Sequence, residues 1–393
     1  MKSYEPTRKR KIAIVHPNKA AYSETFIRSH IENLPARVEE VNYGHWSCPM
    51  YAQKERSLLE LEVDFGSKLQ RLTQRKILKK TPAFFQTQSL INFLQHKQCE
   101  VVLAEYGITG VCIMDACKEA GIPLVVHFHG YDAYDRSILD KFGEAYKILF
   151  EQASAVIAVS RAMERQLIDL GVSKSKLIYN PYGVDISLFA PADVAASAPQ
   201  FVTIGRFVDK KAPYLTLLAF QKVVDVCPEA KLTMIGDGYL LEACKQIAKT
   251  IGIAKNVEFT GLMNHREIAA ILSKARAFLQ HSVQTSYGDS EGTPLAILEA
   301  GATAIPVIST RHAGIPDVVI HEQTGLLVEE GDVDGMARNI ITLAKDTDLA
   351  SKLGKAARER IVEKFSTKQS INNLWKVLNS TIQKQENSQI KAS

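Results

Sequence analysis

The chain has 393 residues, of which 46% are hydrophobic and 23% are charged, and its formal net charge is +5. This is the composition of a globular protein, and the length exceeds the size at which a single core stops growing, so we expect two domains. Six cysteines with no CxxC pair and no metal-ligand spacing indicate a reducing compartment rather than a disulfide framework. The apolar run at residues 12–15 is too short for a signal peptide, and no run approaches a membrane span, so we expect a cytoplasmic protein.

Positive charge is concentrated in residues 68–80, a segment without acidic residues. Lys68, Arg71, Arg75 and Lys79 recur there at helical spacing along one face. Such a helix can bind an anionic membrane surface or a lipid-phosphate acceptor, which would make the protein peripheral on the inner face of the plasma membrane. The alternative is a solvated helix whose charges bind nothing. Nucleic acid is not an expected partner, because the other charges are balanced and no binding motif accompanies the segment.

Short apolar, β-branched runs alternate with amphipathic segments along the whole chain. Such runs between helical segments are typical of parallel sheets covered on both faces. The predicted fold class is α/β, with two Rossmann-like doubly wound domains facing a cleft. The strand-like runs are residues 12–15, 101–104, 124–127, 155–159, 177–179, 201–204, 232–235, 257–260, 277–280, 306–308 and 325–328.

A stretch of small residues with two prolines, residues 189–200, interrupts this pattern as linkers do. We place the domain boundary there, with one domain in residues 1–190 and the other in residues 191–370. Residues 371–393 are expected to form a C-terminal helix that packs back toward the first domain and ends in a loose tail after Lys384. Ligands of doubly wound sheets bind at the carboxyl ends of the strands, so we expect the site in the cleft.

Two glutamates, Glu291 and Glu299, stand on either side of a predicted helix start. Thr293 as N-cap and Pro294 as first helical residue place Glu291 just before the helix and Glu299 inside it. A buried carboxylate needs hydrogen-bond donors, which sugar hydroxyls provide, and a helix start at Gly292 offers free N–H groups to an anion. The pattern fits a ligand with hydroxyls and phosphate. The alternative is a cap-region acid and a helix residue paired with a lysine or arginine.

Basic and glycine residues follow the strand-like runs of the second domain. Arg206 and Lys211 come after the first of these runs, where they fit a diphosphate leaving group, although strand-to-helix loops are often basic without a function. Gly205, Gly236 and Gly261 each stand at a carboxyl end and permit close approach of a ligand to the backbone. A plain tight turn also explains Gly236.

In this order, the segments resemble the retaining nucleotide-sugar glycosyltransferases of family four, the group 1 family with the GT-B fold. The likeness extends over nearly the whole chain. Within the family, residues 23–27 and 288–294 are most similar to exopolysaccharide enzymes of the colanic acid and amylovoran type. Further matching segments are Phe-His-Gly-Tyr-Asp at residues 128–132, Ala-Val-Ser at 158–160, Asn-Pro-Tyr-Gly-Val-Asp at 180–185, Gly-Ile-Pro-Asp at 314–317 and Gly-Leu-Leu-Val at 325–328.

The resemblance implies roles for the donor-binding residues in residues 191–370. Glu291 is expected to face the hydroxyls of the donor sugar, and Glu299 to hold the ribose. The pair Arg206 and Lys211 is expected to stabilise the departing diphosphate. The remaining donor contacts implied by the resemblance are Gly205, Gly236, Gly261, Gly292, Thr293 and Pro294.

In the first domain, which the resemblance makes the acceptor domain, His129 matches the position that touches the donor sugar near the reacting carbon. Its ordinary pKa allows either charge state. Asp132 is expected to position the acceptor, with local capping as the alternative. His127 is expected to point to the opposite face and to be structural.

No residue stands out as an enzyme nucleophile, so the expected reaction is front-face attack with electrostatic stabilisation of the leaving diphosphate. Positive charge from Arg206 and Lys211 replaces a metal, and no metal or other cofactor is expected beyond a donor of the UDP or GDP type. Asp332 and Asp334 fit an Asp-x-Asp metal motif, but they precede a predicted helix and are better explained as N-capping.

Three departures from the family pattern are present. Ala212 and Pro213 stand where a glycine usually follows Lys211, residues 18–22 replace a glycine-rich loop, and residues 281–282 are His-Ser rather than Pro-Ser. The first should alter the helix entry while leaving Lys211 within reach of the ligand.

The predicted function is a retaining hexosyltransferase that acts on a lipid-linked or polysaccharide acceptor in cell-surface polysaccharide synthesis. Transfer to a small soluble acceptor and a non-catalytic nucleotide-sugar-binding protein are the alternatives.

Overall fold

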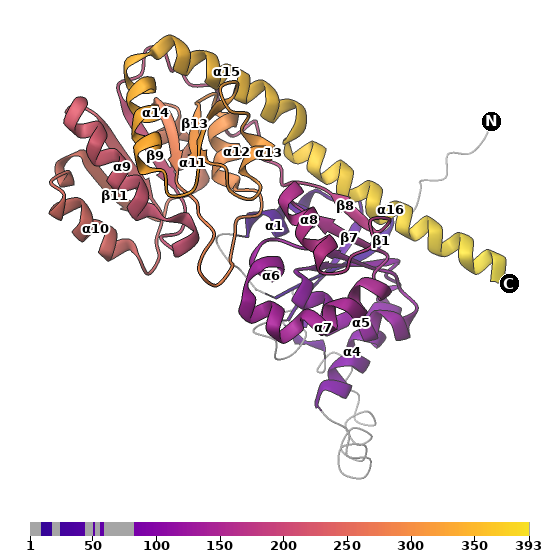
Figure 1. Ribbon diagram of the computed structural model, residues 1–393. Helices are drawn as coiled ribbons and strands as arrows, with labels where there is room; N and C mark the ends of the chain where they lie inside the picture. The colour runs from indigo at the N-terminus through magenta and orange to yellow at the C-terminus, as the bar shows by residue number, and fades with distance from the viewer. Residues whose placement is uncertain (1–8, 18–23, 44–49, 52–55, 59–81, 393) are drawn as a thin grey trace, which may run out of the picture.

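A computed structural model describes residues 9–17, 24–43, 50–51, 56–58 and 82–392 of the chain. Its strands form two sheets that lie in separate bodies, each covered by helices (Figure 1). The predicted α/β class with two doubly wound, Rossmann-like sheets is therefore confirmed. The basic face of Lys68, Arg71, Arg75 and Lys79 lies outside the described residues.

The first sheet contains eight strands in the order β4-β3-β2-β1-β5-β6-β7-β8. All neighbours from β2 to β8 are parallel, whereas the short edge strands β3 and β4 are antiparallel. The elements of this part are β1 (Lys11–His16), α1 (Thr25–Asn33), β2 (Arg37–Asn42), β3 (Met50–Tyr51), β4 (Arg56–Ser57), α4 (Pro82–Lys97), β5 (Val101–Glu105), α5 (Gly107–Ala120), β6 (Leu124–His127), α6 (Tyr131–Tyr134), α7 (Arg136–Gln152), β7 (Ala155–Ala158), α8 (Arg161–Asp169) and β8 (Leu177–Tyr179).

The second sheet contains six parallel strands in the order β11-β10-β9-β12-β13-β14. Two short 3₁₀ helices, η3 and η4, occur in its connections. The elements are β9 (Gln200–Ile204), η3 (Asp209–Lys211), α9 (Pro213–Val226), β10 (Lys231–Ile235), α10 (Leu241–Thr250), η4 (Ala254–Asn256), β11 (Val257–Gly261), α11 (His265–Leu272), β12 (Ala277–Gln280), α12 (Leu295–Ala302), β13 (Val307–Thr310), α13 (Ile315–Val318), β14 (Gly325–Val328), α14 (Val333–Lys345), α15 (Thr347–Lys364) and α16 (Thr367–Ala392).

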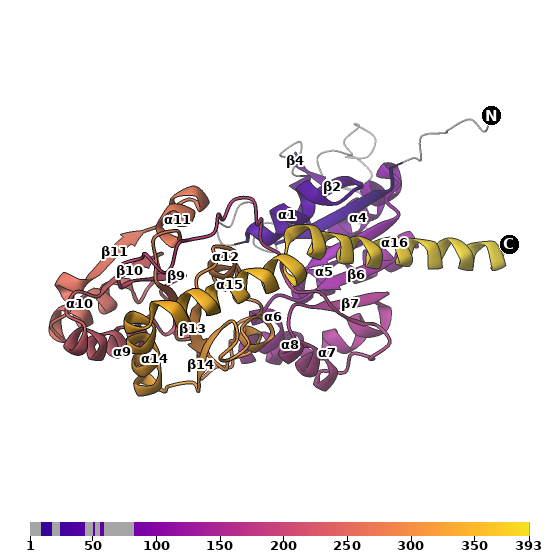
Figure 2. The same ribbon diagram turned by 90° about the horizontal axis from the view of Figure 1, so that it is seen from above.

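Alternate residues of the first-sheet strands enter two different cores. Ile12 and Ile14 of β1 lie in a core with Leu374 and Leu378 of α16, whereas Ala13 and its alternate neighbours face the other side. Because both faces are buried, the strands are apolar along their whole length. Helix α16 therefore covers one face of the first sheet, after α15 has packed beside the second (Figures 1 and 2).

The structure adds strands β2, β3 and β4 to the predicted set and extends the last helix. Strand β2 was not predicted, because the charged residues Arg37, Glu39 and Glu40 mask its apolar pattern; in the structure, Glu39 is buried and pairs with Lys97 at 3.0 Å. At the other end of the chain, α16 continues to Ala392, past the point after Lys384 where a loose tail was predicted.

Among the described residues, no helix has the length and apolar character that crossing a bilayer requires.

Candidate active site

The candidate donor residues gather where the strand order of the second sheet reverses. Strands β9 and β12 are neighbours, although β10 and β11 come between them in the sequence. The connections after these two strands leave the sheet in opposite directions, which opens a crevice at their carboxyl ends. Lys211 follows β9 and Glu291 follows β12. The topology thus brings together two residues that are 80 positions apart.

Lys211 and Glu291 form a buried ion pair in this crevice. The Lys211 Nζ lies 3.1 Å from the Glu291 Oε1, and the Glu291 residue is 6% exposed. The ammonium is close enough to attract the carboxylate but is not aligned with it, so Oε1 has no hydrogen-bond partner among the described residues. A buried carboxylate oxygen in this state favours a ligand that donates a hydrogen bond to it.

Each member of the pair favours the charged form of the other, the Glu291 carboxylate and the Lys211 ammonium. Burial raises the pKa of Glu291, but the positive charges of Lys211, Lys210 and neighbouring groups outweigh burial and leave the pKa below its usual value. Burial lowers the pKa of Lys211, and the attraction of Glu291 offsets part of that effect. The carboxylate is therefore a hydrogen-bond acceptor at neutral pH.

Lys210 is a functional candidate that the sequence analysis did not separate from its neighbour. Its Nζ donates to the Asp289 Oδ1 at 3.0 Å and to the Ser290 carbonyl at 3.2 Å. Lys210 therefore holds the loop that leads to Glu291, while Lys211 faces the carboxylate itself. The two adjacent lysines contact different partners because they lie in the turn of η3.

His312 fixes the main chain of Glu291. The Glu291 N–H donates to the His312 Nε2 at 3.1 Å, and the His312 Nδ1 lies 2.6 Å from the Glu330 Oε1. With Nε2 as acceptor, the ring carries its proton on Nδ1 and donates it to Glu330. His312 was not predicted from the sequence, because it lies after β13 and is separated from Glu291 along the chain.

The start of α12 differs from the prediction by one residue. The helix begins at Leu295 with Pro294 as its N-cap, so the assignment of Thr293 as N-cap was wrong. The Thr293 hydroxyl instead donates to the Val159 carbonyl of the first part of the chain. Among the described residues, the N–H groups of Gly292 and Thr293 have no acceptor, and they lie directly after Glu291.

Gly292 allows the two parts of the chain to meet. A Cβ at this position would lie 2.5 Å from the His129 carbonyl oxygen and 2.8 Å from the Val159 Cγ2. No side chain fits such a distance, so only glycine permits this contact. The segment that carries Glu291 is thereby pressed against the loop that carries His129.

Glu299 lies on the buried side of α12 and is 7% exposed. Its Oε1 lies 3.2 Å from the Nδ1 of His265, the first residue of α11 and about half exposed. The hydrogen bond to Glu299 raises the pKa of His265. His265 was not predicted from the sequence, although it follows β11 and stands beside the cap residue Asn264, a position where ligands of such sheets bind.

The glycines after β9, β10 and β11 have different roles. Gly236 has a φ of +139°, and a Cβ there would lie 2.0 Å from the Gly205 carbonyl oxygen. Its N–H donates to the Gly261 carbonyl at 2.9 Å. Gly236 therefore packs adjacent loops together, whereas Gly261 faces open space. Arg206, next to Gly205, is exposed, and its guanidinium has no ion-pair or hydrogen-bond partner among the described residues.

The ring of His129 points into the first part of the chain. Its Nδ1 lies 2.6 Å from the Tyr182 hydroxyl and its Nε2 lies 2.8 Å from the Glu105 Oε2. Burial lowers the pKa of His129 to about 3, so the ring is neutral. The prediction that His127 points to the opposite face was wrong, because its ring centroid lies 4.4 Å from that of His129. Residues two apart in an extended chain share a face.

Asp132 is a main-chain anchor. Its carboxylate accepts from the N–H groups of Gly107, His129 and Gly130 at 2.9, 3.0 and 2.9 Å. Burial raises its pKa to about 6, against the opposing effect of these hydrogen bonds. The observed contacts are those of the local capping alternative.

Asp332 and Asp334 have separate partners. Asp332 caps α14 by accepting from the Gly335 N–H at 2.7 Å, which confirms the capping interpretation. Asp334 pairs with Lys222 at 2.9 Å on the surface.

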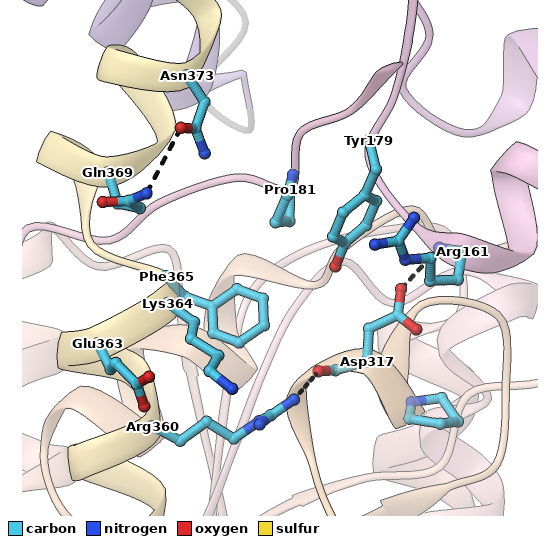
Figure 3. A pocket seen from close by; sticks show the side chains of 11 residues that line it. Arg161, Tyr179, Pro181, Asp317, Arg360, Glu363, Lys364, Phe365, Gln369 and Asn373 are labelled. Atoms are coloured by element: carbon cyan, nitrogen blue, oxygen red, sulfur yellow. Dashed lines mark hydrogen bonds between the residues drawn. The ribbon is translucent and has the colours of Figure 1, made fainter. Parts of the chain in front are cut away.

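A separate polar cavity of about 470 Å³ lies where α8, α13 and the junction of α15 and α16 meet. Figure 3 shows Asp317 in its wall between Arg161 and Arg360. The Arg161 N–H donates to the Asp317 Oδ2 at 2.7 Å, and the Arg360 Nη2 donates to the Asp317 carbonyl at 2.7 Å. Residues from both parts of the chain line this cavity. None of the predicted donor residues is among them, so the cavity is separate from the candidate site.

Two doubly wound sheets whose connections touch, as at Gly292 and Thr293, form the architecture of the GT-B class of fold. A crystal structure of HepE from Anabaena in complex with UDP-glucose has the same fold, with a TM-score of 0.73 at 17% identity, over 94% of this chain and 99% of that one.

The sequence comparisons define the family. Residues 24–188 match Glycosyltransferase Family 4, and residues 189–360 match the glycosyl transferases group 1. The chain therefore belongs to the family-four, group 1 glycosyltransferases.

Three curated relatives illustrate the range of the family. A protein described as the colanic acid biosynthesis glycosyltransferase WcaL of Escherichia coli K12 is 29% identical over 68% of each chain. The amylovoran biosynthesis glycosyltransferase AmsK of Erwinia amylovora is 27% identical over 71% of this chain and 70% of its own. The N-acetyl-alpha-D-glucosaminyl L-malate synthase of Bacillus anthracis is 28% identical over 75% of this chain and 78% of its own.

Proposed function

We propose that this glycosyltransferase transfers a hexose, with retention of configuration, from a nucleotide diphosphate sugar to a lipid-linked or polysaccharide acceptor. The observation that carries the proposal is the Lys211–Glu291 pair beside the free N–H groups of Gly292 and Thr293 at the switch point of the second sheet. A ligand with both hydroxyls and a diphosphate satisfies all of these groups at once.

In the proposed complex, the Glu291 Oε1 accepts a hydrogen bond from a sugar hydroxyl, and the N–H groups of Gly292 and Thr293 donate to the sugar and phosphate. The positive charges of Lys211 and Arg206 stabilise the diphosphate as it leaves. Arg206 is suited to this because its guanidinium has no protein partner among the described residues. Glu299 exchanges its contact with His265 for the ribose hydroxyls.

The proposed chemistry is front-face displacement. The bond between the anomeric carbon and the diphosphate oxygen breaks, the acceptor hydroxyl attacks from the same face, and its proton passes to the departing diphosphate. His129 contributes through its main chain, because its carbonyl lies against Gly292 while its ring nitrogens are held by Glu105 and Tyr182. Asp132 acts by fixing the loop of His129 rather than through its own carboxylate.

The donor site needs no metal in this proposal. Lys211, Arg206 and two N–H groups supply the positive charge that a divalent ion supplies to a diphosphate in other transferases. The test is the transfer rate with Mg²⁺ and with a chelator, with the metal content of the protein measured in each sample. Equal rates in samples shown to contain Mg²⁺ and shown to lack it support the proposal, and a rate that follows added Mg²⁺ contradicts it.

The acceptor class rests on the relatives WcaL and AmsK, whose names place them in exopolysaccharide synthesis. Transfer to a small soluble acceptor remains the second candidate, because the N-acetyl-alpha-D-glucosaminyl L-malate synthase of Bacillus anthracis is similarly related. Cosedimentation of the full chain with anionic vesicles separates the two. Binding that is lost when Lys68, Arg71, Arg75 and Lys79 are replaced by glutamine supports a membrane acceptor at the cytoplasmic face, and no binding favours the soluble acceptor.

A panel of UDP, GDP and ADP sugars tests the activity directly, by release of the nucleotide and by detection of the transferred sugar. Arg206→Ala should slow transfer about 100-fold, and Glu299→Ala should weaken donor binding about tenfold. The control is Arg311→Ala, which alters a surface pair with Glu329. Full activity of both site variants would overturn the proposed donor site, and nucleotide-sugar binding without transfer would indicate a non-catalytic binding protein.

A further inference from the structure

A second group of titratable side chains lies at the carboxyl edge of the first sheet. We call His30, Glu105 and His127 the histidine–glutamate cluster. The three side chains come from α1 and from the last residues of β5 and β6, so separate elements converge on one point. The proposed function uses none of them as a donor or acceptor contact.

The three side chains lie close enough together to approach one ion, although His30 and Glu105 are hydrogen-bonded to each other. The His30 Nδ1 lies 2.7 Å from the Glu105 Oε1, and the His127 Nδ1 lies 3.5 Å from the Glu105 Oε2. One ligand atom from each residue falls within 4.8 Å of the other two. Around a tetrahedral ion with bonds of about 2.1 Å, neighbouring ligand atoms stand about 3.4 Å apart. The observed separations of 2.7 and 3.5 Å bracket that value, so small side-chain movements would suffice to admit an ion.

His127 carries the second, independent observation. Its ring is 1% exposed, and neither of its nitrogens has a hydrogen-bond partner among the described residues. The approach to Glu105 at 3.5 Å is too long for a good hydrogen bond. A buried imidazole with an unpaired N–H and an unpaired acceptor nitrogen destabilises the folded state, because both groups lose their hydrogen bonds to water. Coordination of an ion by Nδ1 would remove part of that cost.

The side chains around the cluster are arranged like those that surround and orient metal ligands. His129 donates from Nε2 to the Glu105 Oε2 at 2.8 Å, which orients the carboxylate, and Tyr182 bonds the other nitrogen of His129. The Phe26 ring packs on Tyr182 and His129 with centroids 4.5 and 4.4 Å away. Partners that orient a ligating carboxylate, inside an apolar shell that excludes water, are typical of protein metal centres.

We propose that the histidine–glutamate cluster binds one divalent transition-metal ion. Two imidazole nitrogens and one carboxylate favour zinc or a similar first-row ion over magnesium or calcium, which prefer oxygen ligands. The ion would be structural: it would tie α1 to the ends of β5 and β6 and so hold the loop of His129. The site is separate from the Lys211–Glu291 pair, so the metal independence proposed for donor activation is unaffected.

The first test is the metal content of the purified full chain, followed by titration of the chelator-treated protein with Co²⁺, which reports nitrogen coordination by its visible absorption. We expect stoichiometric Co²⁺ with intense bands in the native chain and their loss in His30→Ala and His127→Ala. His16→Ala is the matched control, because His16 is equally buried and pairs with Glu40 at 3.0 Å outside the cluster. Absence of these bands in the native chain, or equal bands in all variants, would overturn the proposal in favour of a protein-only hydrogen-bond network.

A second measurement guards against misfolded variants. Co²⁺ should raise the thermal unfolding midpoint of the native chain and of His16→Ala but not that of His30→Ala, whose circular dichroism spectrum shows whether it is folded. An equal rise in all three contradicts the assignment. UDP-sugar binding, measured on the same samples, reports the donor site independently, so failure of the metal proposal and failure of the proposed function remain distinguishable.

Discussion

Each of the two sheets places a buried glutamate at its carboxyl edge, but the surroundings of the two carboxylates differ. Glu105 in the first part is 0% exposed and is surrounded by His30, His127 and His129. Glu291 in the second part is 6% exposed and faces Lys211, with one oxygen left without a hydrogen bond. The difference indicates that the first carboxylate organises the protein, through its imidazole partners and the proposed metal ion, whereas the second is available to the donor substrate.

Electrostatics support the same division. Burial raises the pKa of Glu105, but the neighbouring imidazoles outweigh it and hold the pKa well below the usual value. The Glu105 carboxylate is thus satisfied by groups of its own part of the chain. The Glu291 carboxylate depends on lysines that can also contact a diphosphate. The two glutamates should therefore respond differently to substitution, in stability for one and in activity for the other.

Glu105→Gln should produce the largest effect. Removing the charge from a buried, hydrogen-bonded group leaves its partners uncompensated and costs about 3–5 kcal/mol of stability. The measurement is urea unfolding followed by circular dichroism. Glu40→Gln is the control, since Glu40 pairs with His16 but is partly exposed, and it should cost no more than about 1 kcal/mol. If the two variants are equally stable, Glu105 is not the organising group that the comparison requires.

Lys211→Ala should have the next largest effect, and on activity rather than stability. Removing a positive charge from the leaving diphosphate should lower kcat by about 100- to 1000-fold. Initial rates of sugar transfer measure the change, and the unfolding midpoint checks the fold. Lys222→Ala removes an exposed lysine that pairs with Asp334 and should leave the rate unchanged. A normal rate for Lys211→Ala would show that the Lys211–Glu291 pair is structural, like the histidine–glutamate cluster.

The smallest predicted effect concerns pH and donor binding. The pKa of His265 is raised by Glu299 in the free protein, so the pair is strongest below that pKa and weakens as pH rises through it. If the ribose displaces His265 from Glu299, binding releases a proton, and donor affinity should rise up to about fivefold from pH 6 to pH 8. Calorimetric titrations with UDP in buffers of different pH measure this slope. His265→Ala should flatten it; an unchanged slope would separate His265 from the ribose site.

Most of the fold could be predicted from the sequence because parallel strands buried on both faces consist of continuous apolar residues. The runs that became β1, β5 and β9 are of this kind. Strand β2 was not predicted because its buried Glu39 is paired with Arg37 of the same strand and with the distant Lys97, and no local pattern reveals the second contact.

The candidate site was likewise predicted only in part. Glu291, Lys211 and Gly292 were predicted because each stands after a strand or before a helix, where ligands bind. Lys210 and His312 were not, because their contacts to the loop before Glu291 and to the Glu291 main chain cross between connections after different strands. The start of α12 was misplaced for a related reason: the Thr293 hydroxyl bonds to Val159 in the other part of the chain.

The sequence by itself determined the α/β class, the two sheets and the family, since these depend on periodicity and on short motifs. Only the tertiary structure decided which charged groups face one another: that His127 and His129 share Glu105, and that Lys211 rather than Lys210 meets Glu291. Hydrophobic burial follows local patterns along the chain, whereas charge pairing depends on distances of a few ångströms between segments that only the folded sheets bring together.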